Sequence, residues 1–232
     1  MRAVTDQDEP HEVTADPDVT GVGHDLSALL AALGALGATG LRLVLPVPGD
    51  LIGLGGPRAF NEQAVTAGEC AVVEAPGDAW GLVPTITPFG SDLEPGHLVA
   101  WQVMAANPAP PAGRIGLAEA EQTLRLALVE ATRALTSLDV ARWREDHADA
   151  VFAVRDGVLA AEALPPSLPD RAHRAAATAA RVRAIVELAV LDDGAAISSR
   201  QADLRRQALR EVDAVARRGL VAAVNAALEP GR

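Results

Sequence analysis

Residues 97–138 read HLVAWQVMAANPAPPAGRIGLAEAEQTLRLALVEATRALTSL, and the spacing of their apolar side chains changes within this stretch. From His97 to Ala105 apolar residues point to both faces of an extended chain, which is typical of a central strand or one covered on both sides. Residues 106–116 are rich in proline and glycine, as linkers between domains often are. From Leu117 onward apolar residues recur every three or four positions, the period of an amphipathic helix. The stretch therefore predicts a sheet, then a linker, then helices.

The segment after the linker predicts a bundle of four helices over residues 117–232. The expected helices cover residues 117–138, 146–159, 170–193 and 198–228. Narrow alanine-rich stripes on the last two would let another helix approach closely. These stripes, together with helices longer than a small bundle needs, favour a homodimer.

Residues 24–106 predict a small mixed β-sheet with one or two helices. Four segments have strand-like apolar patterns: residues 41–47, 70–74, 80–87 and 97–105. Pro76 and Gly77 supply the backbone geometry of a tight turn, so the second and third segments should form a hairpin. Pro84 and Pro88 lack the N–H group that a ladder needs. The third strand should therefore lie at an edge, or place its prolines at bulges or outward-facing positions.

The N-terminal residues 1–23 are acidic and lack apolar periodicity, which predicts a disordered acidic tail. Asp25 is a suitable N-cap for a helix that follows it. The predicted organisation is thus a tail over 1–23, a sheet part over 24–106, a linker over 107–116 and a helical bundle over 117–232. This is an α+β fold.

Composition excludes several classes of protein. The chain has 232 residues with 49% apolar residues, so it can bury a sizeable core. Cys70 is the single cysteine, which excludes an intramolecular disulfide or a multi-cysteine metal site. All twenty basic residues are arginine, so a Schiff-base lysine and a Walker-type phosphate loop are excluded as well. No long apolar span or signal peptide is found, and we expect a cytoplasmic protein without a membrane partner.

The negative charge is concentrated in the first part of the chain. Residues 1–164 hold nine arginines and 23 acidic residues, a net −14, whereas residues 165–232 hold 11 and eight, a net +3. An acidic protein repels phosphate backbones at long range. Nucleic acid is therefore not an expected partner.

A glycine-rich loop is the strongest candidate for a binding site. It lies between a predicted strand and a predicted helix, and its glycines include Gly53, Gly55 and Gly56. The free N–H groups of the helix that follows, with Arg58 in its first turn, would favour a small phosphate or carboxylate. The spacing does not match G-x-G-x-x-G, and glycines at such a turn also serve backbone geometry alone.

Other polar residues near this loop could supply an acid or a base. Asp50, Glu69 and His97 complete the candidate ligand-binding set, in which we assign no catalytic residue. The cluster Glu145, Asp146, His147 and Asp149 is better explained by a charged first helical turn than by a metal site. Ser91, Asp92 and His97 have the residue types of a hydrolase triad without its surrounding motif. We therefore predict no metal and no cofactor.

One stretch of the sequence resembles a known group of proteins. It consists of LVLPVPGD at residues 43–50, followed by Gly-Pro-x-x-Phe, Ala-Gly-Glu and Gly81-Leu82-Val83-Pro84. These motifs resemble a family of uncharacterised proteins from high-GC actinobacteria, over most of residues 25–228. The resemblance implies a bacterial cytoplasmic origin, and it carries no activity or functional residue.

The sequence favours a non-catalytic binding or scaffolding protein that associates through its C-terminal helices, with itself or with a protein partner. The alternative is an enzyme or sensor that binds a small anionic metabolite at the loop from Gly49 to Arg58. An enzyme should show a pocket bordered by Asp50, Arg58 and Glu69.

Overall fold

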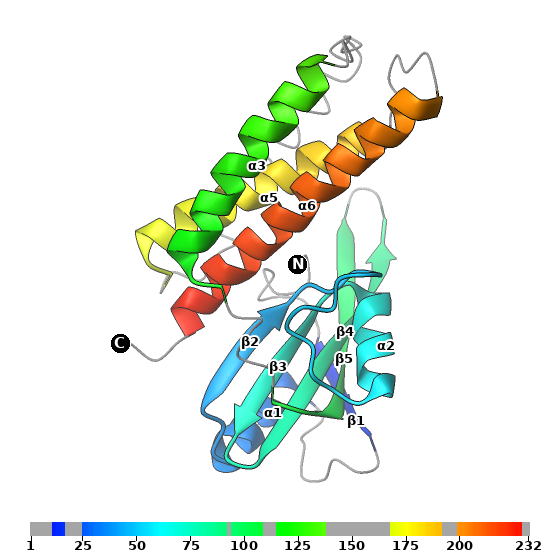
Figure 1. The fold of residues 1–232 in the computed structure, drawn as a ribbon. Helices are drawn as coiled ribbons and strands as arrows, with labels where there is room; N and C mark the ends of the chain where they lie inside the picture. The colour runs from blue at the N-terminus through cyan, green and yellow to red at the C-terminus, as the bar shows by residue number, and fades with distance from the viewer. Residues whose placement is uncertain are drawn as a thin grey trace. The chain divides into compact units, whose positions relative to one another are not determined.

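A computed structural model of the chain describes residues 11–16, 25–91, 94–108, 115–137, 168–191 and 199–228. The chain divides into two compact units (Figure 1). One comprises Met1–Arg114 with Leu228–Arg232, and the other comprises Ile115–Ala227. We describe each unit separately.

The first unit contains a five-stranded mixed sheet with two helices. Its elements are β1 (His11–Ala15), α1 (Leu26–Ala35), β2 (Gly40–Val44), α2 (Arg58–Ala67), β3 (Cys70–Ala75), β4 (Asp78–Gly90) and β5 (Pro95–Ala106). The strand order is β1-β5-β4-β3-β2. Neighbouring strands are antiparallel except β1 and β5, which are parallel. The predicted α+β class with a small mixed N-terminal sheet is confirmed.

The strand β1 was not expected from the sequence. His11–Ala15 pairs with Val99–Val103 of β5, and Val13 is buried at the centre of this pairing. The prediction of a disordered tail is therefore wrong for His11–Ala15, while residues 1–10 and 17–24 lie outside the described residues. The tertiary pairing with β5 stabilises a segment whose own apolar content is low.

The two prolines of β4 lie in the part of the strand that has a single neighbouring strand. β3 pairs with Asp78–Leu82, whereas β5 pairs with Ala79–Gly90. Both prolines lie beyond Leu82, in the stretch of the described sheet that β5 alone pairs with. The prediction of an edge strand is wrong for the first half of β4 and correct for the half that holds Pro84 and Pro88, because only a one-sided stretch tolerates residues without an N–H group.

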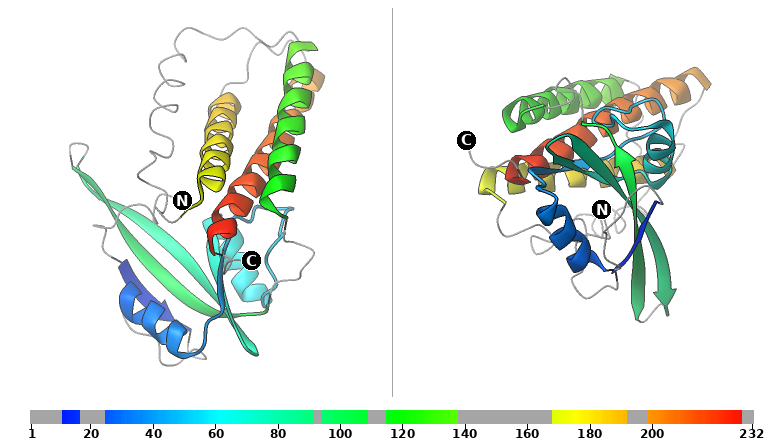
Figure 2. Two further views of the ribbon diagram at one scale, coloured as in Figure 1. Left: turned by 90° about the vertical axis from the view of Figure 1, so that its left-hand side faces the viewer. Right: turned by 90° about the horizontal axis from the view of Figure 1, so that it is seen from below.

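Each face of the sheet packs against one helix (Figures 1 and 2). Leu29 and Leu33 of α1 pack with Val99, Trp101 and Val103 of β5. On the other face, α2 packs with side chains that include those of β2, β3 and β5. The pattern predicted for residues 97–105 thus gives β5 a buried row on the α1 side, and half-buried residues with the buried Met104 on the other side.

Local sequence signals set the ends of these elements. The Asp25 side chain accepts a hydrogen bond from the Ala28 N–H at 2.8 Å and caps α1, as predicted. Gly68 ends α2 with a φ of 75°, and Gly77 turns the chain between β3 and β4 with a φ of 88°. Both angles lie in the left-handed region, where glycine is favoured.

The second unit is built from long helices that pack together. The structure describes α3 (Leu117–Ser137), α5 (Asp170–Leu191) and α6 (Ser199–Leu228). The helix expected over residues 146–159 lies outside the described residues. Figure 2 shows the three helices side by side. Arg171 of α5 forms an ion pair with Glu121 of α3 at 2.6 Å, and Arg183 of α5 pairs with Asp213 of α6 at 3.2 Å.

Small residues allow the three helices to approach closely. A Cβ atom built at Gly219 of α6 would lie 3.6 Å from the Ala179 Cβ of α5 and 3.8 Å from the Leu124 Cδ2 of α3. Ala172, Ala176 and Ala179 have no exposed surface. At these three positions the alanine stripe on α5 is therefore buried within the chain. Among the described helices, none combines the length and apolar character needed to cross a membrane.

Candidate functional site

The loop that was predicted to bind an anion begins with a tight turn. Val47 and Asp50 exchange two backbone hydrogen bonds, at 3.1 and 2.9 Å. The Asp50 side chain accepts a further hydrogen bond from the Ile52 N–H at 3.3 Å. These contacts give Asp50 a structural function in the turn between β2 and α2.

The glycines of the loop make room for neighbouring side chains. Gly53 has a φ of 92°, and a Cβ atom there would lie 3.2 Å from a methyl group of Val44. A Cβ atom at Gly56 would overlap the ring of Phe60, which is 1% exposed. Gly55 is half-buried. Backbone geometry and packing thus account for Gly53 and Gly56 without a bound anion.

Arg58, which was predicted to meet the anion, forms an ion pair with Glu62 one helical turn away. The Arg58 Nε donates to the Glu62 Oε1 at 2.6 Å, and 91% of the Arg58 side chain is exposed. The hydrogen bond and charge of Glu62 raise the pKa of the Arg58 guanidinium. An anion bound at this arginine would compete with the Glu62 carboxylate.

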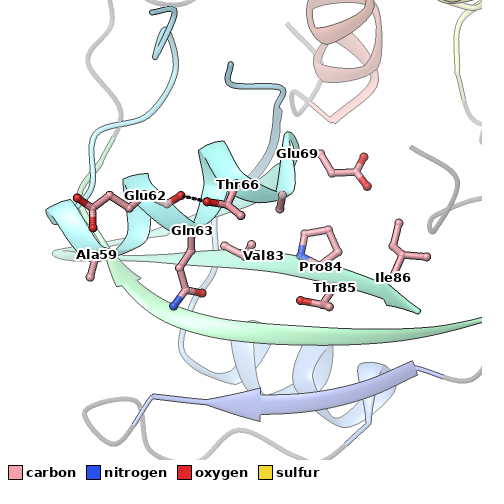
Figure 3. A pocket seen from close by; sticks show the side chains of 10 residues that line it. Ala59, Glu62, Gln63, Thr66, Glu69, Val83, Pro84, Thr85 and Ile86 are labelled. Atoms are coloured by element: carbon pink, nitrogen blue, oxygen red, sulfur yellow. Dashed lines mark hydrogen bonds between the residues drawn. The ribbon is translucent and has the colours of Figure 1, made fainter. Parts of the chain in front are cut away.

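A groove lies between α2 and the proline-containing stretch of β4 (Figure 3). Its volume is about 650 Å³, and Glu69 lies at one end, beside the start of β3. Its lining residues are Ala59, Glu62, Gln63, Thr66, Ala67, Glu69, Val83, Pro84, Thr85 and Ile86. Of the seven predicted ligand-binding residues, Glu69 alone lines this groove, and it is buried.

His97 does not line the groove. Its β4 partner is Pro88, two residues beyond the last groove residue of β4, Ile86, which pairs with Val99. The structure therefore does not bring His97 to the groove, and whether any of the seven residues binds a ligand remains a prediction.

The other sequence candidates are not assembled into sites within the described part of the chain. The Ser91 hydroxyl accepts a hydrogen bond from the Glu94 N–H at 3.3 Å in the turn between β4 and β5. Asp92 and the cluster from Glu145 to Asp149 lie outside the described residues. Among the residues that the structure describes, no group of three or more His, Cys, Asp and Glu side chains is placed to hold a metal ion.

The groove was not predicted, although one signal pointed toward it. Gly81 lies inside β4, and a Cβ atom there would overlap the ring of Phe60 from the strand side. A glycine in the interior of a strand often marks a close approach of another group. Here it marks the place where α2 lies against β4, beside the groove.

Cys70 is buried and chemically protected. Its side chain is packed with those of α2 and β2, and burial raises the pKa of the thiol to about 12, an effect that Arg42 opposes and Glu69 reinforces. A thiol that keeps its proton at neutral pH is a poor nucleophile. Cys70 therefore acts as a small apolar core residue.

We predict that the free energy of unfolding depends on pH through the Cys70 thiol. The chain has no lysine and no tyrosine, so Cys70 is the only side chain whose ordinary pKa lies between those of histidine and arginine. Its pKa is higher in the folded than in the unfolded chain, so the unfolded chain loses its proton first and stability falls as pH rises. We expect the free energy of unfolding to decrease by about 1 kcal/mol between pH 9 and pH 10.

Urea denaturation at the two pH values measures this change. The Cys70→Ala variant is the control, because it has no thiol to titrate. An equal decrease in the variant and the wild type would contradict the assignment.

Comparison with known proteins identifies the family of the chain. Residues 1–115 match the family model described as Rv1486c-like protein, N-terminal domain, and residues 118–221 match Rv1486c-like protein, C-terminal domain. The uncharacterized protein Rv1486c of Mycobacterium tuberculosis is 32% identical over 235 aligned positions, covering 91% of this chain and 80% of the relative. The uncharacterized protein ML1804 of Mycobacterium leprae is 30% identical over 203 positions, covering 81% and 68%.

No solved structure matches the chain. The relatives are mycobacterial, in agreement with the resemblance to uncharacterised proteins of high-GC actinobacteria that the motifs at residues 43–84 indicated. Matches to both domain models and the coverage of the relatives lead to one conclusion: the chain belongs to the Rv1486c-like family.

Proposed function

We propose that this protein is a non-catalytic, cytoplasmic binding or scaffolding protein that associates through its C-terminal helices with a second copy of itself. The observation that carries the proposal is a set of exposed apolar side chains at one end of the α5 and α6 pair. Val190 of α5 is 56% exposed, and Leu204 of α6 is 45% exposed.

The contacts between α5 and α6 place these two side chains at the same end. Ala179 faces Gly219, and Arg183 pairs with Asp213, so the two helices run antiparallel. Val190 lies seven residues beyond Arg183, and Leu204 lies nine residues before Asp213, which corresponds to roughly 10 and 14 Å of helix. The two exposed side chains therefore lie at a similar height.

Burial decreases toward this end of α6. Between Ser199 and Ala208 the described side chains are exposed or half-buried, whereas Leu209 and Val212 are buried. Most of the stability of a protein helix comes from packing of its apolar face. A second copy that covers Val190 and Leu204 would supply that packing.

The anion-binding alternative has less support. Arg58 is paired with Glu62, and packing against Val44 and Phe60 accounts for two of the loop glycines. The groove beside α2 is lined by two carboxylates and by no arginine, which does not favour an anionic ligand.

We expect wild-type protein to sediment as a dimer at micromolar concentration. The double variant Val190→Glu, Leu204→Glu should weaken the dimer at least about tenfold, because dimerisation would then bury four carboxylates. Sedimentation velocity over a range of concentrations measures the dissociation constant.

The matched control is Ile52→Glu, which replaces an apolar side chain that is equally exposed but lies in the loop of the first unit. It should leave the dimer unchanged. A monomeric wild type, or a dimer that the helix variant does not weaken, would overturn the proposal.

A further inference from the structure

The strand β1 lies at one edge of the described sheet, where β5 is its strand neighbour, and all five of its residues pair with Val99–Val103. Val13 is its only buried residue, and the Asp16 N–H donates to the Val103 carbonyl at 2.9 Å just after the strand. Side-chain hydrogen bonds to β5 add to this backbone pairing.

Two side-chain pairs connect β1 and the residue after it to β5. The Gln102 amide donates to the Asp16 carboxylate at 3.0 Å. The Trp101 indole Nε1 donates to the His11 Nδ1, also at 3.0 Å. An imidazole nitrogen accepts a hydrogen bond only when it carries no proton, so this contact requires neutral His11 with its proton on Nε2.

The ring geometry shows that the contact is a hydrogen bond and not a stacking of faces. The ring planes are inclined by 23°, and the ring centroids are 6.3 Å apart. With 3.0 Å between the two nitrogens, rings that are nearly parallel at this separation meet edge to edge. A protonated imidazole in this position gains little from the indole face, because cation–π attraction acts above a ring and not at its edge.

We propose that the His11–Trp101 pair makes β1 a pH-sensitive latch, closed while His11 is neutral and opened when His11 is protonated. Protonation places an N–H on Nδ1, opposite the indole N–H. The buried Trp101 indole then faces a second donor and loses its acceptor. Opening uncovers the edge of β5 from Val99 to Val103, which β1 otherwise pairs with.

Several charged groups lie on β1 or on the elements that pack against it. Glu12 and Asp16 lie on and beside β1, and Asp25, the N-cap of α1, forms an isolated bridge with Glu12. Helix α1 itself carries no charged side chain. His97, two residues before the β5 partner of His11, is a further titratable group on this side of β5.

Hydrogen exchange of the Asp16 amide reports whether β1 is docked. We expect its protection factor, which corrects for the intrinsic effect of pH, to fall at least about fivefold between pH 8 and pH 5 in the full-length protein. The Gly68 amide, bonded to the Ala64 carbonyl at the end of α2, should keep its protection, since the change is local.

Three variants test whether His11, and not another titratable group, controls the docking of β1. In His11→Gln the side-chain amide oxygen can accept from Trp101 at either pH, so the Asp16 amide should stay protected. His97→Gln and Asp16→Asn should keep the wild-type response. As a measurement on unmodified protein, the Trp101 indole N–H resonance should shift along the titration curve of the His11 ring.

Three results would overturn the proposal. They are an unchanged protection factor in the wild type, a fall of the same size in His11→Gln, and an indole resonance that does not follow the His11 titration. Loss of the response in His97→Gln would also overturn it, since the sensor would then be the other histidine.

Discussion

Replacing Gly81 with alanine should destabilise the first unit by about 3 kcal/mol, because the new methyl group overlaps the ring of Phe60. The ring is wedged between α2 and the sheet, with Gly56 on the other side of it. Gly81 pairs with Val72 of β3 and Met104 of β5, so the strand is held on both sides and cannot move away. Urea denaturation of the variant measures the loss.

A second substitution tests whether the ring is the cause. Phe60→Leu removes part of the ring, so Gly81→Ala should be less harmful in that background by about 1–2 kcal/mol. Gly34→Ala is the matched glycine control, because a Cβ atom on this residue of α1 meets nothing within 4 Å. It should stabilise the protein by roughly 0.5–1 kcal/mol through helix propensity. Equal effects of Gly81→Ala in both backgrounds would argue against the clash.

The second large effect is expected at Gly219, where α6 meets α3 and α5. Gly219→Ala should stabilise the second unit by up to about 1 kcal/mol, because its Cβ would make ordinary contacts at 3.6 and 3.8 Å and alanine favours a helix. Gly219→Leu should destabilise it by about 3 kcal/mol, because the larger side chain has no space between Ala179 and Leu124. Thermal unfolding of the two variants gives opposite shifts of Tm.

The contacts of Gly219 can be tested with a compensating change. Leu124→Ala alone should cost about 3 kcal/mol as a cavity. Combined with Gly219→Leu it should cost less than the sum of the two single changes, since the volume lost on α3 is replaced from α6. Additive effects would show that α3 and α6 do not meet at this position.

Several parts of the fold were predictable because their signals are local. The Asp25 cap, the Gly68 helix end and the Pro76-Gly77 turn each act over a few residues, and the structure contains all three. The period of apolar residues identified β5 and the helices beginning at Leu117, Asp170 and Ser199. Such patterns reflect which side of one element is buried, and this can be recognised without knowing the partner.

The candidate site was less predictable, because the sequence places residues in order and not in space. The pattern of glycine, Arg58 and nearby acids suggested an anion site, but Arg58 pairs with Glu62 and His97 does not line the groove. The groove beside α2 combines a helix with a strand about twenty residues later, and only Glu69 was among the predicted residues. No local pattern specifies such a combination.

By itself the sequence determined the class of fold, the change from strands to helices after the proline-rich linker and most element ends, because periodicity and capping depend on neighbours in the chain. Only the tertiary structure decided that His11–Ala15 joins the sheet beside β5 and that Gly81 gives space to Phe60. It also decided that Ala179 of α5 lies against Gly219 of α6. Each of these depends on a partner far away in the chain, and its stability comes from packing or pairing that forms only when the two segments meet.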